Sequence, residues 1–264
     1  MEILSYTAFI LMGIILGLIG GGGSILTVPI LVYLFGTETV AATSYSLFIV
    51  GVTAMVGSFK YFTDKLVDLK AAVAFSIPSL LAVFAVRKII IPIIPDELFT
   101  IFGINITKSI FILLVFAVLM LLASFSMLRK STIDKKYENT GFNYPLIFVE
   151  GILVGAITGF VGAGGGFLII PALVLLAKIP MKVAIGTSLV IIAAKSLLGF
   201  LGDVTNDLSI DWISLSMYSI LSVTGIFIGS KLSGKLSQER LKKVFAYFVL
   251  VMGIFIIMKE LFFK

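Results

Sequence analysis

Residues Gly159–Pro171 read Gly-Phe-Val-Gly-Ala-Gly-Gly-Gly-Phe-Leu-Ile-Ile-Pro, a glycine cluster within sequence that is otherwise apolar enough for lipid. Residues Gly17–Pro29 read Gly-Leu-Ile-Gly-Gly-Gly-Gly-Ser-Ile-Leu-Thr-Val-Pro, and an offset of 142 residues carries one stretch onto the other without a gap. The same offset aligns Gly13 with Gly155, Ser46 with Ser188 and Gly57 with Gly199. An internal duplication is the simplest explanation of this register.

The composition is that of an integral membrane protein. Hydrophobic residues make up 59% of the 264 positions and charged residues only 13%, which is too little polar surface to cover a water-soluble globule. Apolar runs long enough to cross about 30 Å of hydrocarbon recur along the chain. The first run, 3–19, follows Met1 and Glu2 without a basic stretch or a small-residue cleavage site, so we interpret it as a retained helix.

Ten apolar segments lie in two groups of five, one on each side of the polar stretch 129–143. The segments are 3–19, 24–36, 40–59, 71–94, 105–128, 145–161, 166–178, 183–202, 210–231 and 244–263. We therefore predict an all-α polytopic membrane protein. Its predicted parts are a first transmembrane repeat at 1–128, a cytoplasmic linker at 129–144 and a second transmembrane repeat at 145–264.

Lysine and arginine residues predict the orientation of the chain. With the linker in the cytoplasm, alternation places the basic loops around Lys65 and Lys182 inside, and the acidic residues Asp96, Glu97 and Asp203 outside. Both termini are then external. Because each half crosses an odd number of times, the halves form an inverted repeat, which is typical of secondary transporters. This parity is the same whether 24–36 and 166–178 span the membrane or re-enter it.

The residue types exclude several classes of function. The chain contains no cysteine and no histidine, which removes disulfides, thiolate nucleophiles and the usual zinc or copper sites. The net charge of +6 comes from basic residues between apolar runs, where they act as orientation signals rather than as a nucleic-acid surface. We expect no cofactor, no catalytic residue and no metal.

The two glycine turns are the candidate binding site. Segments 24–36 and 166–178 are too short to span comfortably, so each is expected to be a short or broken helix that begins or ends inside the membrane. Ser24 and Gly166 are predicted to be their first residues, where unpaired N–H groups favour an anion. The alternative is that the glycines serve only close helix packing.

Hydroxyl groups and one lysine extend this candidate site. Ser44 and Ser46 in the first half, and Thr187 and Ser188 in the second, lie early in the third segment of each half. They either donate to the same anion or bond back to their own helices.

Lys195 is the only basic residue deep within an apolar segment, which marks it as a functional candidate. It either neutralises the substrate, pairs with Glu150 or Asp203, or extends toward the membrane surface. Arg87 and Lys88 precede two prolines and are interpreted as interface residues.

The paired motifs, Gly-Xaa-Xaa-Gly-Gly-Gly-Gly-Ser before Pro29 and Gly-Xaa-Xaa-Gly-Ala-Gly-Gly-Gly before Pro171, with Ala-Ile-Gly-Thr-Ser-Leu at 184–189, are specific. The whole chain resembles the sulfite exporter TauE/SafE family. The resemblance implies a carrier of sulfite, thiosulfate, sulfoacetate or a related anion in the cytoplasmic membrane. With Lys195, which the resemblance does not supply, the candidate binding residues are Gly21, Gly22, Gly23, Ser24, Ser44, Ser46, Gly164, Gly165, Gly166, Thr187, Ser188 and Lys195.

We thus expect a secondary transporter of small sulfur-containing anions, including organosulfonates, that works by alternating access within the lipid bilayer. An anion channel and a carrier of non-sulfur organic acids stay open as alternatives, and a membrane-embedded enzyme or insertion factor is the least favoured one. A proton is an open coupling ion, with Glu150, Asp203 and Lys195 as candidate groups. The direction of transport and the oligomeric state stay open.

Overall fold

The computed structural model describes residues 2–21, 23–101, 104–128, 144–161, 165–173, 179–204, 210–233 and 238–262. Its elements, in chain order, are α1 (Glu2–Ile19), α2 (Ser24–Pro29), η1 (Ile30–Leu34), α3 (Thr39–Thr63), α4 (Leu69–Ala85), η2 (Val86–Ile90), α5 (Ile91–Ile93), β1 (Glu97–Ile101), β2 (Ile104–Thr107), α6 (Lys108–Leu128), α7 (Tyr144–Val161), α8 (Gly166–Pro171), α9 (Met181–Val204), α10 (Trp212–Ser233) and α11 (Gln238–Phe262). Here η1 and η2 are single π-helical segments.

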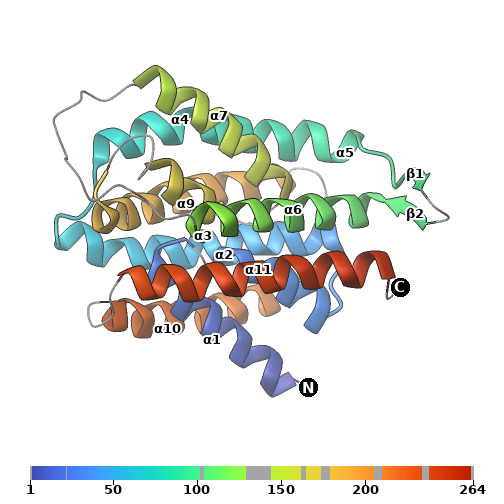
Figure 1. Ribbon diagram of the computed structural model, residues 1–264, viewed down its shortest axis with the longest axis horizontal. Helices are drawn as coiled ribbons and strands as arrows, with labels where there is room; N and C mark the ends of the chain where they lie inside the picture. Colours follow the sequence, from blue (N-terminus) through green and yellow to red (C-terminus); the bar gives the residue numbers. More distant parts are fainter. Residues whose placement is uncertain are drawn as a thin grey trace.

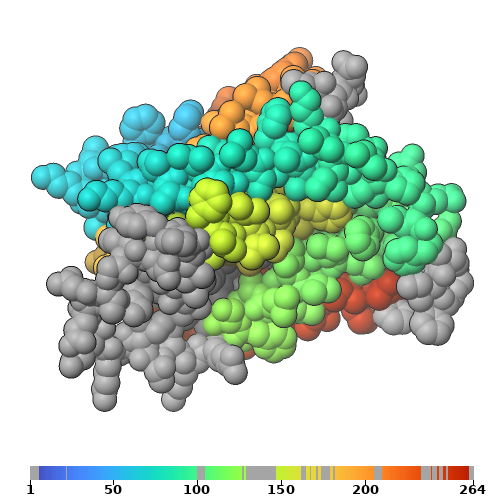
Figure 2. Space-filling view, turned by 90° about the horizontal axis from the view of Figure 1, so that it is seen from above, coloured from blue at the N-terminus to red at the C-terminus, as the bar shows by residue number. Residues whose placement is uncertain are grey.

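The helices confirm the predicted all-α polytopic membrane protein. Within the described ranges, five helices are long and apolar enough to cross a membrane, namely Thr39–Thr63, Leu69–Ile93, Lys108–Ser126, Lys182–Val204 and Trp212–Leu232. Their outward faces carry large apolar side chains, such as Ile213, which is 83% exposed, and Leu81, which is 69% exposed. Figure 2 shows one face of the molecule, where α4, α7 and α6 lie side by side. Such faces suit lipid rather than water.

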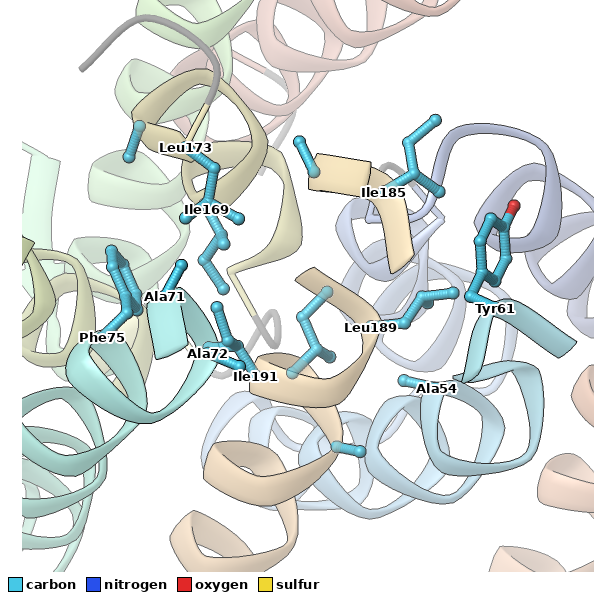
Figure 3. Packing of buried hydrophobic residues seen from close by; sticks show 14 of the residues in the cluster. Ala54, Tyr61, Ala71, Ala72, Phe75, Ile169, Leu173, Ile185, Leu189 and Ile191 are labelled. Carbon is cyan, nitrogen blue, oxygen red and sulfur yellow. The ribbon is translucent and has the colours of Figure 1, made fainter. Parts of the chain in front are cut away.

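The helices lie roughly along the long axis of the molecule (Figure 1). Helix α1 packs on α10, α4 packs on α7, and α6 packs on α11, whereas α3 and α9 pack against each other between these pairs. The largest buried cluster joins α3, α4, α8 and α9. In Figure 3, its side chains include Ala54, Phe75, Ile169, Leu189 and Ile191. The two glycine turns therefore adjoin the centre of the fold.

The packing of the two halves follows the sequence duplication. If the five helical segments of one half are exchanged with those of the other, the α1–α10 contact becomes the α7–α4 contact, and the α3–α10 contact becomes the α9–α4 contact. The contacts between α3 and α9 and between α6 and α11 map onto themselves. This agreement supports the duplication, while the inverted orientation of the halves stays a prediction.

Individual glycines show the same equivalence. A Cβ atom at Gly13 would meet the carbonyl of Ser222, and a Cβ atom at its counterpart Gly155 would meet the carbonyl of Ser79. Helix α4 maps onto α10 with an offset of 143, one residue more than in the preceding segments, and this offset carries Ser79 onto Ser222. Both helix crossings are thus close backbone approaches that only glycine permits.

The loops that precede α4 and α10 are closed in the same way. The Asp68 N–H donates to the Thr187 hydroxyl at 2.9 Å, and the Asp211 N–H donates to the hydroxyl of Tyr45, the counterpart of Thr187, at 2.7 Å. Each aspartate also caps its helix: Asp68 Oδ1 accepts from Ala71 N, and Asp211 Oδ1 accepts from Ser214 N. The Ser214 hydroxyl, which donates to the other oxygen of Asp211, lowers the pKa of that carboxyl.

The antiparallel hairpin β1–β2 was not predicted. Segment 105–128 was expected to be helical from its first residue, but the helix begins at Lys108. Its β-branched residues at 104–107 pair with 97–101 instead, because Pro92 and Pro95 end the preceding helix and leave these residues outside it. Of the predicted linker, only Tyr144, the first residue of α7, lies within the described residues.

Candidate functional site at the two glycine turns

The two glycine turns meet in the structure, although they are separated by more than half of the chain. A Cβ atom at Gly21 would lie 2.6 Å from the carbonyl carbon of Gly166, and one at Gly166 would lie 2.8 Å from the carbonyl oxygen of Gly21. Real Cβ atoms never come this close, so each turn is glycine because the other turn is packed against it. Gly22 and Gly164 lie outside the described residues. The helices after the turns begin at Ser24 and Gly166, as predicted.

The first turn is held by hydroxyl groups. Gly20 has a φ of +79°, and its carbonyl oxygen accepts a hydrogen bond from Ser188 Oγ at 3.0 Å. Ser188 Oγ also lies 2.8 Å from the Ile185 carbonyl. Ser24 Oγ donates to the Gly21 carbonyl at 2.7 Å, and Gly23 packs against α1. In this structure the protons of both serines therefore go to backbone carbonyls, where they stabilise the turn.

The second turn lies against a buried ammonium group. Gly165 has a φ of +69°, and a Cβ atom at this position would lie 2.5 Å from Lys195 Nζ. Lys195 is 1% exposed, and its ammonium donates to the Thr158 hydroxyl at 3.0 Å. Because both αL geometry and the neighbouring ammonium exclude a side chain, glycine is required at residue 165. The structure thus brings Lys195 to the turn, as the candidate site requires.

No carboxylate within the described ranges forms an ion pair with Lys195. Of the two acidic partners considered from the sequence, Asp203 pairs elsewhere. Glu150 is partly buried, and its Oε1 atom has no hydrogen-bond partner in the described part of the chain. A buried ammonium whose described partner is one hydroxyl is costly, because a neutral oxygen does not compensate its charge.

The remaining hydroxyls are distributed over other contacts. Thr187 accepts the Asp68 N–H described above. Ser44 and Ser46 are both fully buried in α3, and Ser44 lies beside the Asp203 carboxyl group. Ser46 Oγ has no hydrogen-bond partner among the described residues. Its counterpart Ser188 bonds to Gly20, and the residue that corresponds to Gly20, Gly162, lies outside them.

Arg87 has a buried partner that the sequence interpretation did not foresee. The side chain is fully buried within the protein, and its predicted place at the membrane interface stays a prediction. Its Nη1 atom donates to the Thr43 hydroxyl at 2.9 Å and lies 3.3 Å from Asp203 Oδ2, which joins η2 to both α3 and α9. Only the neighbouring Lys88 is exposed, with its ammonium over the Phe84 ring. The signal that could have found this cluster was the place of Arg87 within the apolar segment 71–94, where a charged side chain needs a partner.

Comparison with known proteins identifies the family. The family description "Sulfite exporter TauE/SafE" matches residues 6–256. A "Probable membrane transporter protein" of Xylella fastidiosa strain Temecula1 is 31% identical over 256 residues, which cover 95% of this chain and 92% of the relative. The "Probable membrane transporter protein YunE" of Bacillus subtilis is 27% identical, with 97% and 96% covered. A relative from Methanocaldococcus jannaschii with the same description is 25% identical, with 94% of each chain covered. No solved structure matches the chain. The chain belongs to the sulfite exporter TauE/SafE family of membrane transporters.

Proposed function

We propose that this protein is a secondary carrier of a small sulfur-containing anion, such as sulfite, thiosulfate, sulfoacetate or another organosulfonate. The carrier works by alternating access in the cytoplasmic membrane, with the linker in the cytoplasm and both termini outside. The anion binds at the two glycine turns, and Lys195 supplies the positive charge. The family description supports this substrate class, and the geometry around Lys195 supports an anion.

The observation that carries the proposal is the lone ammonium of Lys195. It lies against the backbone of Gly165 and bonds to Thr158, and no described carboxylate neutralises it. A small oxyanion beside Nζ would supply the missing negative charge and accept its remaining protons. The backbone at Gly165 would stay close to this anion because it carries no side chain.

The packing of the two halves supports alternating access. Carriers built from inverted repeats place their substrate where the repeats meet, and broken helices often form the site. Here Gly21 of the first half meets Gly166 of the second. Gly21 lies in the turn before the short helix that begins at Ser24, and Gly166 is the first residue of the other short helix. A change in the contact between the turns would open the site to one side of the membrane and close it to the other.

Chemistry other than transport has little support. The chain holds no cysteine or histidine, which are frequent nucleophiles and acid–base groups in enzymes. The candidate groups for proton coupling are Lys195, Glu150 and Asp203, which are ionisable residues within or beside apolar segments. Coupling would appear as transport that responds to an imposed pH gradient at constant anion gradient.

Purified protein in liposomes tests the proposal. Labelled sulfite, thiosulfate and sulfoacetate are offered outside, and we expect saturable uptake of at least one of them. Uptake should be faster when the liposomes hold the same unlabelled anion, because a carrier exchanges substrate, whereas a channel does not. If none of the three anions is taken up but simple carboxylates are, the protein carries organic acids without sulfur instead. Unsaturable flux without exchange would establish a channel.

A further inference from the structure

A groove with a volume of about 500 Å³ lies between the ends of α3 and α10, and none of the candidate binding residues lines it. Its walls include Val56, Phe59, Ile226 and Phe227. Phe59 is 67% exposed and Phe227 is 55% exposed, although both are large apolar side chains. In a membrane protein this exposure means that the groove opens sideways into the hydrocarbon of the bilayer.

Basic residues occupy one end of this groove. Lys60 lies in the last turn of α3 and Lys231 in the last turn of α10, and both line the groove. Figure 1 shows that α3 ends at the side of the molecule opposite the β1–β2 hairpin. Because both helices end there, the lysines lie at the depth of the lipid headgroups, while the aromatic walls lie deeper.

Lys60 is exposed, but a backbone contact fixes its ammonium group at the groove. Lys60 Nζ donates to the Ser230 carbonyl at 2.7 Å, which fixes its ammonium at the groove and leaves it further protons to donate. The carboxyl ends of two helices carry partial negative charge and by themselves repel an anion. Attraction of a negative group must therefore come from the two ammonium groups, and none of the described residues that line the groove is a carboxylate that would oppose them.

We propose that this groove binds an anionic phospholipid of the surrounding leaflet. The phosphate contacts Lys60 and Lys231, and one acyl chain lies along Phe59 and Phe227. The separation of charge and apolar surface matches this ligand. A soluble anion would leave the aromatic walls without a partner, and a zwitterionic lipid would bring its own positive group close to the two lysines. The site does not depend on which anion the protein carries.

Native mass spectrometry of detergent-purified protein tests the charged end. Phosphatidylglycerol and phosphatidylcholine with identical acyl chains are added at equal concentrations, and more phosphatidylglycerol should be retained. Lys231→Gln should lower its affinity about fivefold, which corresponds to one lysine near an anionic surface. Lys60→Gln with Lys231→Gln should remove the preference. The matched control is Lys65→Gln with Lys70→Gln, two exposed lysines outside the groove that should change nothing.

Equal retention of the two lipids, or an unchanged preference in the Lys60 and Lys231 double variant, would overturn the proposal. Lys231→Gln leaves the bond from Lys60 to Ser230 intact, so a loss of folding in the double variant cannot hide the result.

Filling the groove tests the apolar end without a change of charge. Val56→Trp places a large ring in the groove and should release phosphatidylglycerol. The control Ile220→Trp adds the same ring to α10 at an outward position that is 66% exposed, and it should retain the lipid. An excess of inorganic phosphate should not displace the lipid. Displacement by phosphate, or full retention in Val56→Trp, would mean that the lysines bind a free anion instead.

Discussion

The first glycine turn is surrounded by hydroxyls and carbonyls, whereas the second lies against a buried ammonium. Lys195 maps onto Thr53 in the first half, and Thr158 maps onto Leu16. Thr53 bonds to the Ile49 carbonyl of its own helix, and Leu16 is a fully buried apolar residue. The charged group that faces one turn therefore has no counterpart at the other.

The same asymmetry between the halves appears at the Arg87–Asp203 pair. Arg87 and Asp203 correspond to Ser230 and Tyr61, which carry no charge at neutral pH. Yet the close packing at glycine is shared: Gly57 lies against the Ile226 side chain, and its counterpart Gly199 lies against the side chain of Val83, which is the counterpart of Ile226. The duplication thus kept the close backbone approaches and changed the charges. A carrier of one small anion needs one charged contact rather than two, and the proposed site has that composition.

The largest expected effect concerns the Arg87–Asp203 pair. Arg87→Met leaves the Asp203 carboxylate buried without its cation, and we expect the protein to lose about 3–5 kcal/mol of stability. Unfolding in detergent, followed by thermal or denaturant titration, measures the loss. The double variant Arg87→Met with Asp203→Leu should recover most of it, because no buried charge is left unpaired. The counterpart change Ser230→Ala should cost far less stability. An equal cost would contradict the asymmetry between Arg87 and its uncharged counterpart.

Lys195→Met should separate transport from stability. The substitution keeps the unbranched stem of the side chain and removes a buried charge that has no described carboxylate partner, so stability should hold or rise. Loss of a hydrogen bond to an anion by a charged group costs about 1.5–3 kcal/mol, which corresponds to a rise of roughly 10- to 100-fold in the half-saturating anion concentration. Liposome uptake and melting temperature measure the two quantities.

The control for Lys195→Met is Thr53→Val, the equivalent position in the first half. It should leave the half-saturating concentration unchanged, because the partner of Thr53 among the described residues is the Ile49 carbonyl of its own helix. If both variants weakened transport equally, the two turns would contribute equally to binding. If Lys195→Met instead destabilised the protein without changing the affinity for the anion, the ammonium would be structural.

Local rules of sequence predicted the turns but not their partners. Helix starts at Ser24 and Gly166 were predictable because glycine runs and segment length act over a few residues. The burial of Arg87 was missed because its partner Asp203 is distant in sequence, and a charge beside prolines locally resembles a membrane interface. The bond from Ser188 to Gly20 was missed for the same reason, since it joins the two halves across the fold.

Ser188→Ala should have a moderate effect. It removes the hydroxyl that bonds the Gly20 carbonyl, and a lost hydrogen bond of this kind costs about 1 kcal/mol. Ser46→Ala is the matched change in the first half, and it should cost less because Ser46 Oγ has no partner among the described residues. The free energy of unfolding of both variants, measured side by side, tests this order. A larger cost for Ser46→Ala would show that its hydroxyl holds an equally strong contact.

The smallest expected effects are at the two closed loops, where the halves are most alike. Tyr45→Phe and Thr187→Val each remove the hydroxyl that accepts an aspartate N–H, from Asp211 and from Asp68 respectively. Both N–H groups are only partly buried, so water replaces much of the lost bond, and we expect each variant to lose less than about 1 kcal/mol. Hydrogen exchange at the two aspartate amides should accelerate in the matching variant and stay unchanged in the other. If Thr187→Val also weakened anion binding while Tyr45→Phe did not, Thr187 would contact the substrate in addition to closing its loop, and the asymmetry between the halves would extend to this pair.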